Sequence, residues 1–184
     1  MDIDARESIA QETIEQQVSK KKAALLDVIA LSPDAMVTGS LAELLQEGVN
    51  FNDAIAQAGD IDALVNTKLF TPEQAGQIPV LEYKHGNTLE LQAAVNTFSA
   101  DQLERAIPTV FEGKQLLLMN IDDIAGKTLA DAQLIGSSPT YLRIKRLEYD
   151  KKIQRLRRMV HSTALGKTLP EIKNAVENFL QGIS

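Results

Sequence analysis

The stretch SPTYLRIKRLEYDKKIQRLRRMVHSTALG, residues 138–166, carries the clearest helical signal of the chain. Ser138 suits an N-cap, Pro139 suits the first helical position, and Gly166 suits the left-handed position after a helix. Between these ends, apolar side chains recur at spacings of three, four and seven residues, which places them on one narrow stripe of a helix. The stripe predicts a seam against another helix, as in a coiled coil. Its members are Leu142, Tyr149, Ile153, Leu156 and Val160.

The same helix is strongly basic. Between positions 143 and 158 it holds eight basic and two acidic residues, whereas the whole chain has a net charge of −6. A charge run of this kind is either a solvated helix surface or a surface for an acidic partner, which would be a protein or a nucleic acid. The basic residues are Arg143, Lys145, Arg146, Lys151, Lys152, Arg155, Arg157 and Arg158.

Composition narrows the class of protein. The 184 residues are 44% hydrophobic but only 4% aromatic, so the core must consist of aliphatic side chains. The absence of cysteine excludes disulfides, thiolate catalysis and Cys-ligated metals. The acidic first residues lack a signal-peptide pattern, and no apolar run is long enough for a membrane span. We therefore expect a cytoplasmic protein or a non-secreted component of a larger particle.

The chain is expected to have three parts. Residues 1–32 form an N-terminal helical arm, whose first 19 residues have a net charge of −4 and are expected to dock on the basic helix. Residues 137–184 form a C-terminal helical hairpin. Residues 33–136 form a compact helical middle.

In the middle part, short helices are expected because capping residues and glycines alternate. Ser40 and Ser99 each precede a Glu or Gln by three residues, which is the capping-box spacing. Helices are also predicted for residues 60–70 and 89–98, and a helical turn for residues 71–76. Residues 78–85 are predicted as a strand or an extended connector, and residues 109–119 as a β-hairpin or a helix.

The chemical motifs are weak. The sequence Gly-Lys-Thr-Leu at 126–129 and 166–169 lacks the earlier glycine of a phosphate-binding loop, so it is interpreted as a helix stop and cap. Asp60 and Asp62 begin like a calcium-binding loop, but Leu64 and Val65 stand where that loop needs an acid and a glycine.

The remaining candidate groups are interpreted as structural. His85 and His161 belong to no metal-binding or catalytic pattern, and Asp122 and Asp123 suit the first turn of a helix. We therefore predict no catalytic residue, no metal site, no cofactor and no small-molecule substrate.

Together these observations predict a mainly α fold, with several short helices, a long N-terminal helix, a C-terminal helical hairpin and a few short antiparallel strands as an option in the middle. The expected function is non-enzymatic. The chain would be a structural or adaptor subunit that self-associates as a homo-oligomer or joins a larger complex, such as a viral or phage assembly. The alternative is a nucleic-acid-binding regulator that uses the basic helix 143–158. A membrane partner is not expected.

Overall fold

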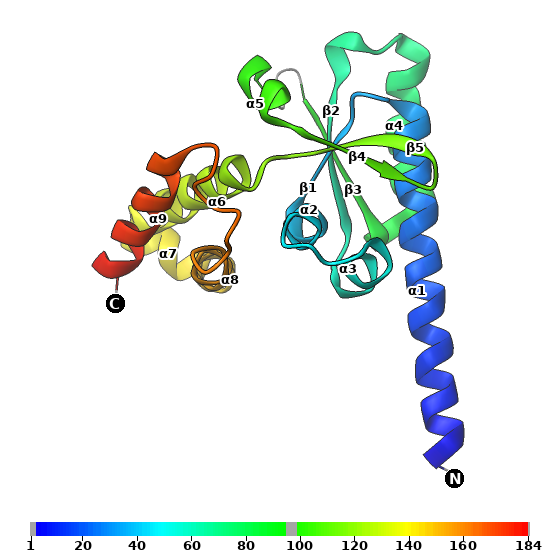
Figure 1. Cartoon of the computed structure of the whole chain (residues 1–184), viewed down its shortest axis with the longest axis horizontal. Helices are drawn as coiled ribbons and strands as arrows, with labels where there is room; N and C mark the ends of the chain where they lie inside the picture. Colours follow the sequence, from blue (N-terminus) through cyan, green and yellow to red (C-terminus); the bar gives the residue numbers. More distant parts are fainter. Residues whose placement is uncertain (1–2, 95–98, 184) are drawn as a thin grey trace. The chain divides into compact units, whose positions relative to one another are not determined.

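The structure, a computed structural model, describes the backbone of residues 3–94 and 99–183 and the side chains of residues 14–92 and 99–183. The chain divides into two compact units, Met1–Met119 and Asn120–Ser184. The sequence instead placed boundaries after residues 32 and 136. Figure 1 shows the elements of both units, which are described separately below.

The first unit contains a mixed five-stranded sheet, so the mainly α prediction is wrong and the fold is α/β. The strand order is β3-β2-β1-β5-β4. β1 is antiparallel to β2 and parallel to β5, β2 is parallel to β3, and β4 is antiparallel to β5. The strands are β1 (Met36–Thr38), β2 (Ile61–Asn66), β3 (Leu89–Ala94), β4 (Ile107–Phe111) and β5 (Lys114–Leu118).

Two of these strands replace predicted helices. In β2, Ile61, Ala63, Leu64 and Val65 are all buried, so the strand has apolar side chains on both faces and no period-two pattern. Such a short apolar run is indistinguishable from a buried helix by periodicity alone. In β3, Leu89 and Leu91 are buried on one face, and a helix was predicted over 89–98. Residues 95–98 of that prediction lie outside the described residues.

Five α-helices of the first unit accompany the sheet. They are α1 (Ile3–Leu31), α2 (Gly39–Gln46), α3 (Phe51–Gln57), α4 (Pro72–His85) and α5 (Ala100–Arg105). Short 3-10 turns follow β2 at Thr67–Leu69 and α4 at Gly86–Thr88. The consecutive buried residues of β1 and β2 indicate that both faces of these central strands are covered.

α4 corrects the prediction for residues 71–85. The capping box at Thr71 is formed with Gln74, but the helix continues through Gly76 and Pro79 to His85. The strand or connector predicted at 78–85 is therefore wrong. Packing of α4 against β3 and α1 outweighs the local cost of the glycine and the proline, because helices in proteins are stabilised mainly by tertiary contacts.

Other local predictions are confirmed. Residues 107–118 form the β-hairpin, and its turn residues Glu112 and Gly113 have φ values of 47° and 76°, as a tight two-residue hairpin turn requires. The capping box at Ser99 is present. The capping box predicted at Ser40 is absent, because α2 begins two residues earlier than expected, at Gly39, and its N-cap is Thr38.

The long N-terminal helix is also confirmed as α1. Its last three turns contribute Ala24, Leu25, Val28 and Ile29 to the core. Residues 14–17 are exposed, and in Figure 1 the N-terminal half of α1 extends past the other elements of the first unit.

The second unit is helical. It contains α6 (Ile121–Gly136), α7 (Pro139–Ile144), α8 (Arg146–Met159) and α9 (Pro170–Gly182). α7, α8 and α9 all pack on α6, so the predicted two-helix hairpin is only part of a four-helix unit. Among the described helices of the chain, none is both long and apolar enough to span a bilayer.

The long helix predicted over 138–166 is broken. Lys145, with φ −104° and ψ 22°, separates α7 from α8, and α8 ends at Met159. α6, in contrast, continues through Gly126, where a stop was predicted. A Cβ at Gly126 would lie 3.4 Å from Cδ1 of Ile172 on α9, so this glycine allows the two helices to approach closely.

Candidate functional site

Three carboxylates of the first unit lie close together in space. Oxygen atoms of Asp60, Asp62 and Glu90 all lie within 4.8 Å of one another. Asp60 and Asp62 are half-buried, and Glu90 is exposed. Within the part of the chain that the structure describes, no other three Asp, Glu or His side chains converge in this way.

The sheet brings these side chains together. Asp62 and Glu90 are register partners on the neighbouring parallel strands β2 and β3. Asp60 comes two residues before Asp62, so both side chains lie on the same face where β2 begins. The cluster is therefore a product of strand pairing between residues separated by about thirty positions.

The N-terminus of α2 adjoins this cluster. β1 runs antiparallel to β2 and ends at Thr38, whose register partner is Asp62, and α2 begins at the next residue, Gly39. Gly39 has a φ of 72°. A Cβ atom at this position would overlap the carboxylate oxygen Oδ2 of Asp62, so only glycine fits between the strand end and the carboxylate.

The first turn of α2 receives no side-chain cap from its N-cap residue. The hydroxyl of Thr38 instead donates to Sδ of Met119, at 3.5 Å. The first N–H groups of a helix have no partner within the helix and carry partial positive charge. Such a terminus binds phosphate groups.

Lys21 of α1 fixes the segment that leads into Asp60. Its ammonium group is buried and donates to the carbonyl oxygens of Ile55, at 3.1 Å, and of Ala58, at the C-terminal end of α3. Burial lowers the pKa of Lys21, and attraction to the Asp60 carboxylate opposes that shift only in part. Lys21 thus positions the loop between α3 and β2 and adds a positive charge near the cluster.

The cluster offers only carboxylate oxygen atoms as ligands. Three carboxylates and no nitrogen or sulfur ligand favour a hard divalent cation such as Mg²⁺ or Mn²⁺. The carboxylates would hold the cation, and the α2 terminus could hold an anion beside it. A metal-bound phosphate ester or polyphosphate is the ligand class that needs both.

The predicted interaction seam lies on α7 and α8. Ile153 and Leu156 are buried, and Leu142, Tyr149 and Val160 are half-buried. α8 packs on α6 of the same unit, and a Cβ at Gly136 of α6 would lie 3.3 Å from the Tyr149 ring. The seam residues therefore have neighbours within the chain, and contact with a second copy through them remains a prediction.

The predicted basic residues differ in their surroundings. Lys145, Arg146 and Lys152 form ion pairs with acids of α6 or α8. Arg143, Lys151, Arg157 and Arg158 are exposed, and Arg155 is half-buried. Arg143 and Arg146, with Pro139 and Leu142, line a shallow hollow where α7 meets α8.

The second Gly-Lys-Thr-Leu segment has a structural role in the second unit. Its backbone N–H groups surround the fully buried Asp122 carboxylate, which accepts from Gly166 at 2.6 Å, Thr168 at 3.0 Å and Leu169 at 2.7 Å. The amide of Asn120 also donates to Thr168 Oγ1, at 3.0 Å. These donors hold an anion from the chain itself, in keeping with the rejection of a phosphate-binding loop.

The two histidines were predicted to be structural. His85 Nε2 lies 2.7 Å from Oδ2 of Asp27, which also accepts from Lys84 at 2.7 Å. This contact joins α4 to α1. His161 is exposed just beyond α8, where its backbone N–H donates to the carbonyl oxygen of Arg158, at 3.1 Å.

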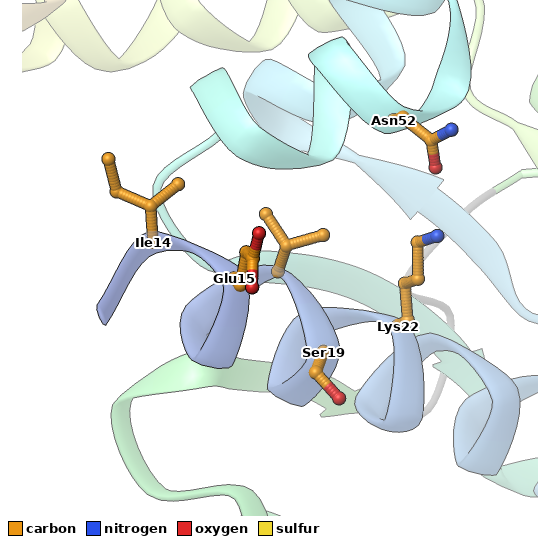
Figure 2. A pocket seen from close by; sticks show the side chains of 6 residues that line it. Ile14, Glu15, Ser19, Lys22 and Asn52 are labelled. Carbon is orange, nitrogen blue, oxygen red and sulfur yellow. The ribbon is translucent and has the colours of Figure 1, made fainter. Parts of the chain in front are cut away.

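A second hollow lies between α1 and α3. Figure 2 shows Lys22 of α1 and Asn52 of α3 extending toward one another, with Ile14 farther along α1 and Ser19 directed away. The lining is completed by Glu15 and Val18. This mixed set has one basic and one acidic side chain and lacks the convergence seen at the carboxylate cluster.

Sequence reasoning missed the carboxylate cluster. Asp60 and Asp62 were tested only against a calcium loop, and Glu90 was placed within a predicted helix. The signal that was present is the alternation Asp60-Ile61-Asp62, which on a strand places both carboxylates on one face. The third carboxylate became apparent only from the pairing of β2 with β3.

Comparison of the chain with protein families, with curated proteins and with solved structures finds no match in any of the three.

Proposed function

We propose that the first unit is a divalent-metal-dependent transferase that takes a nucleoside triphosphate and transfers its nucleotidyl group to an acceptor. The observation that carries this proposal is the position of the Asp60–Asp62–Glu90 cluster directly beside the N-terminus of α2. In this proposal the carboxylates hold the metal, and the first turn of α2 binds the phosphate chain.

The metal part of the proposal follows from charge. Three carboxylates whose oxygen atoms lie within 4.8 Å of one another repel each other, and a shared cation would relieve that repulsion. Oxygen-only ligands suit Mg²⁺, which is typically bound by a few carboxylates and by substrate phosphates.

The substrate part follows from the neighbouring helix. A single phosphate needs only one anion site, whereas a polyphosphate can bridge a metal and a helix N-terminus. The close approach of Gly39 to Asp62 places these two sites next to each other. Ser40, the second residue of α2, adds a half-buried hydroxyl group to the same turn.

The proposed reaction is the one that a metal-bound triphosphate supports. An acceptor hydroxyl attacks the α-phosphorus and releases its proton to solvent, the bond from that phosphorus to the oxygen that bridges it to the β-phosphorus breaks, and pyrophosphate leaves with the electron pair of that bond. Metal ions lower the barrier by stabilising the charge on the attacking and leaving oxygens. This proposal differs from the non-enzymatic role expected from the sequence, which did not take the three carboxylates as a group.

The test has two stages. Titration with Mn²⁺, followed calorimetrically, should show binding to the unchanged protein. Asp62→Asn should weaken that binding by at least about 10-fold, since loss even of groups that only support metal ligands typically costs that much. Asp101→Asn, at an exposed acid in the first turn of α5, is the matched control and should leave binding unchanged.

The second stage identifies the reaction. The protein is incubated with Mg²⁺ and the four ribonucleoside triphosphates, and pyrophosphate and orthophosphate are measured separately. Nucleotidyl transfer predicts Mg²⁺-dependent pyrophosphate release that is lost in Asp62→Asn. Release of orthophosphate alone would show γ-phosphate chemistry instead. Equal Mn²⁺ affinity in Asp62→Asn and Asp101→Asn would refute the metal site.

A further inference from the structure

The second unit exposes a group of basic side chains that its own acids do not neutralise. These are Arg143 on α7 and Lys151, Arg157 and Arg158 on α8. Among the described residues, none of the ion pairs involves these four.

The acids of α8 are already paired. Glu148 lies 3.1 Å from Lys145 and 3.8 Å from Lys152, and Asp150 lies 3.1 Å from Arg146. Lys152 also contacts Asp131 of α6, at 2.9 Å. Local pairing therefore uses both acids of α8 and leaves an excess of positive charge on the surface.

Three of the remaining cations, Lys151, Arg157 and Arg158, are exposed on α8. Ile153, Leu156 and Met159 define its buried face. Lys151 and Arg158 are seven residues apart, hence nearly in line along the helix, and their helical positions are opposite the buried stripe. Leu147, four residues before Lys151, belongs to the same face and is 71% exposed.

The charge is a property of the whole unit. Residues 120–184 contain eleven Lys and Arg against seven Asp and Glu, a net charge of +4. Residues 1–119 contain eight Lys and Arg against eighteen Asp and Glu, a net charge of −10. The negative net charge of the complete chain therefore does not reveal that its second unit is basic.

We infer that the exposed surface of α7 and α8 binds the phosphodiester backbone of a nucleic acid. Three of the four unpaired cations are arginines, whose planar guanidinium groups bind phosphates in a bidentate manner. Lys151 and Arg158 span about 10 Å of helix, a length over which a duplex carries about six phosphate charges. Ile144 and Leu147 are about 70% exposed beside these cations and offer apolar contact to sugars or bases.

This inference stands apart from the proposed reaction, because it concerns residues of the other unit. If the protein binds nucleic acid but no Mn²⁺, this inference holds and the transferase proposal fails. If the protein binds Mn²⁺ but no nucleic acid, the transferase proposal holds and this inference fails.

The experiment is a fluorescence-anisotropy titration of the full chain. The probes are a single-stranded DNA, a single-stranded RNA and a duplex DNA, each measured at 50 mM and 200 mM salt. Four phosphate contacts predict that affinity for the duplex falls about 100-fold between the two salt concentrations. Binding of at least one probe in the micromolar range at 50 mM salt is expected.

Two double variants locate the surface. Lys151→Glu with Arg158→Glu should weaken binding at least 10-fold at 50 mM salt and reduce the salt slope by about 2. Lys20→Glu with Lys114→Glu changes the net charge equally, at exposed residues of the first unit, and should change affinity less than threefold. Circular dichroism checks that both variants keep their helical content.

Three outcomes would overturn the inference. The first is no binding of any probe at tens of micromolar protein in 50 mM salt. The second is equal loss of affinity in the two double variants. The third is displacement of the nucleic acid by polyglutamate at equal charge concentration, which would assign the surface to an acidic protein such as the N-terminal arm of another copy.

Discussion

At the scale of single residues, Gly39 and Asp62 show how closely the candidate site is built. The positive φ of Gly39 turns the chain from β1 directly into α2, and the missing side chain leaves room for the Asp62 carboxylate. Any larger residue would both strain the backbone and displace a proposed metal ligand. Glycine at position 39 therefore allows both the turn of the backbone and the position of the Asp62 carboxylate that the proposed metal site needs.

Gly39→Ala is predicted to lower both stability and Mn²⁺ affinity. The left-handed backbone costs about 1–2 kcal/mol for a residue with a Cβ, and overlap with Asp62 adds to that cost. The matched control is Gly48→Ala, because Gly48 has a φ of 87° but nothing within 4 Å of an added Cβ.

Urea unfolding and Mn²⁺ titration of both variants separate the two costs. Gly48→Ala should lose only the backbone contribution and should bind Mn²⁺ normally. Equal unfolding free energies and equal Mn²⁺ affinities for the two variants would contradict the role given to Gly39.

At the scale of elements, a charged clasp joins α1 to α4. Asp27 of α1 accepts from both Lys84 and His85 at the end of α4, and the His85 side chain is only 6% exposed. Burial by itself would raise the pKa of Asp27, but the hydrogen bonds and positive charges of Lys84 and His85 outweigh burial and lower it. The clasp thus depends on an ionised carboxylate.

Asp27→Asn is predicted to lower the unfolding free energy by about 1 kcal/mol at neutral pH, as expected for a partly exposed charged hydrogen bond. A carboxylate whose pKa is lower in the folded state stabilises the fold above its unfolded pKa, near 3.9, and this contribution is lost as pH falls through the folded value. The stability difference from the unchanged protein should therefore shrink as pH falls below about 4 and disappear below the folded pKa of Asp27.

Urea unfolding between pH 3 and pH 8 checks this dependence. Asp34→Asn, at an exposed acid in the turn after α1, is the control and should show little difference at any pH. A deficit for Asp27→Asn that stays constant down to pH 3 would show that its ionisation does not matter.

At the scale of the whole molecule, the two units carry opposite net charge. In the second unit, the buried carboxylate of Asp122 at the start of α6 accepts hydrogen bonds from three backbone N–H groups in the segment before α9. All of these partners belong to residues 120–184. Loss of the Asp122 carboxylate should therefore lower the stability of that unit.

Asp122→Asn is predicted to destabilise the second unit by about 2–4 kcal/mol, since an amide nitrogen would replace an acceptor facing buried donors. Asp131→Asn is the control on the same helix, because its ion pair with Lys152 is partly exposed and contributes at most about 1 kcal/mol.

Hydrogen exchange measured by mass spectrometry resolves the effect by segment. Asp122→Asn should accelerate exchange in residues 160–183 and in α6, with protection of β1, β2 and β5 unchanged. Equal acceleration in both units would show that they unfold together.

Several features that depend only on neighbouring residues were predicted from the sequence. They are the long N-terminal helix α1, the capping box at Ser99, the β-hairpin that was one of two alternatives for residues 109–119, and the concentration of positive charge between 143 and 158. Each of these rests on local hydrogen bonding, local backbone geometry or simple counting, which do not require knowledge of distant contacts.

Other features depend on contacts between residues that are distant in the chain. They are the strands at residues 61–66 and 89–94, the continuation of α4 through Gly76 and Pro79, and the meeting of Asp60, Asp62 and Glu90. A short apolar segment such as Ile61–Val65 is compatible with helix or strand, and its state is set by the partner that supplies its hydrogen bonds. β2 finds these partners in β1 and β3, which are distant in the chain. The proposed active site exists for the same reason, because its third carboxylate is brought to the first two by strand pairing and by no local pattern.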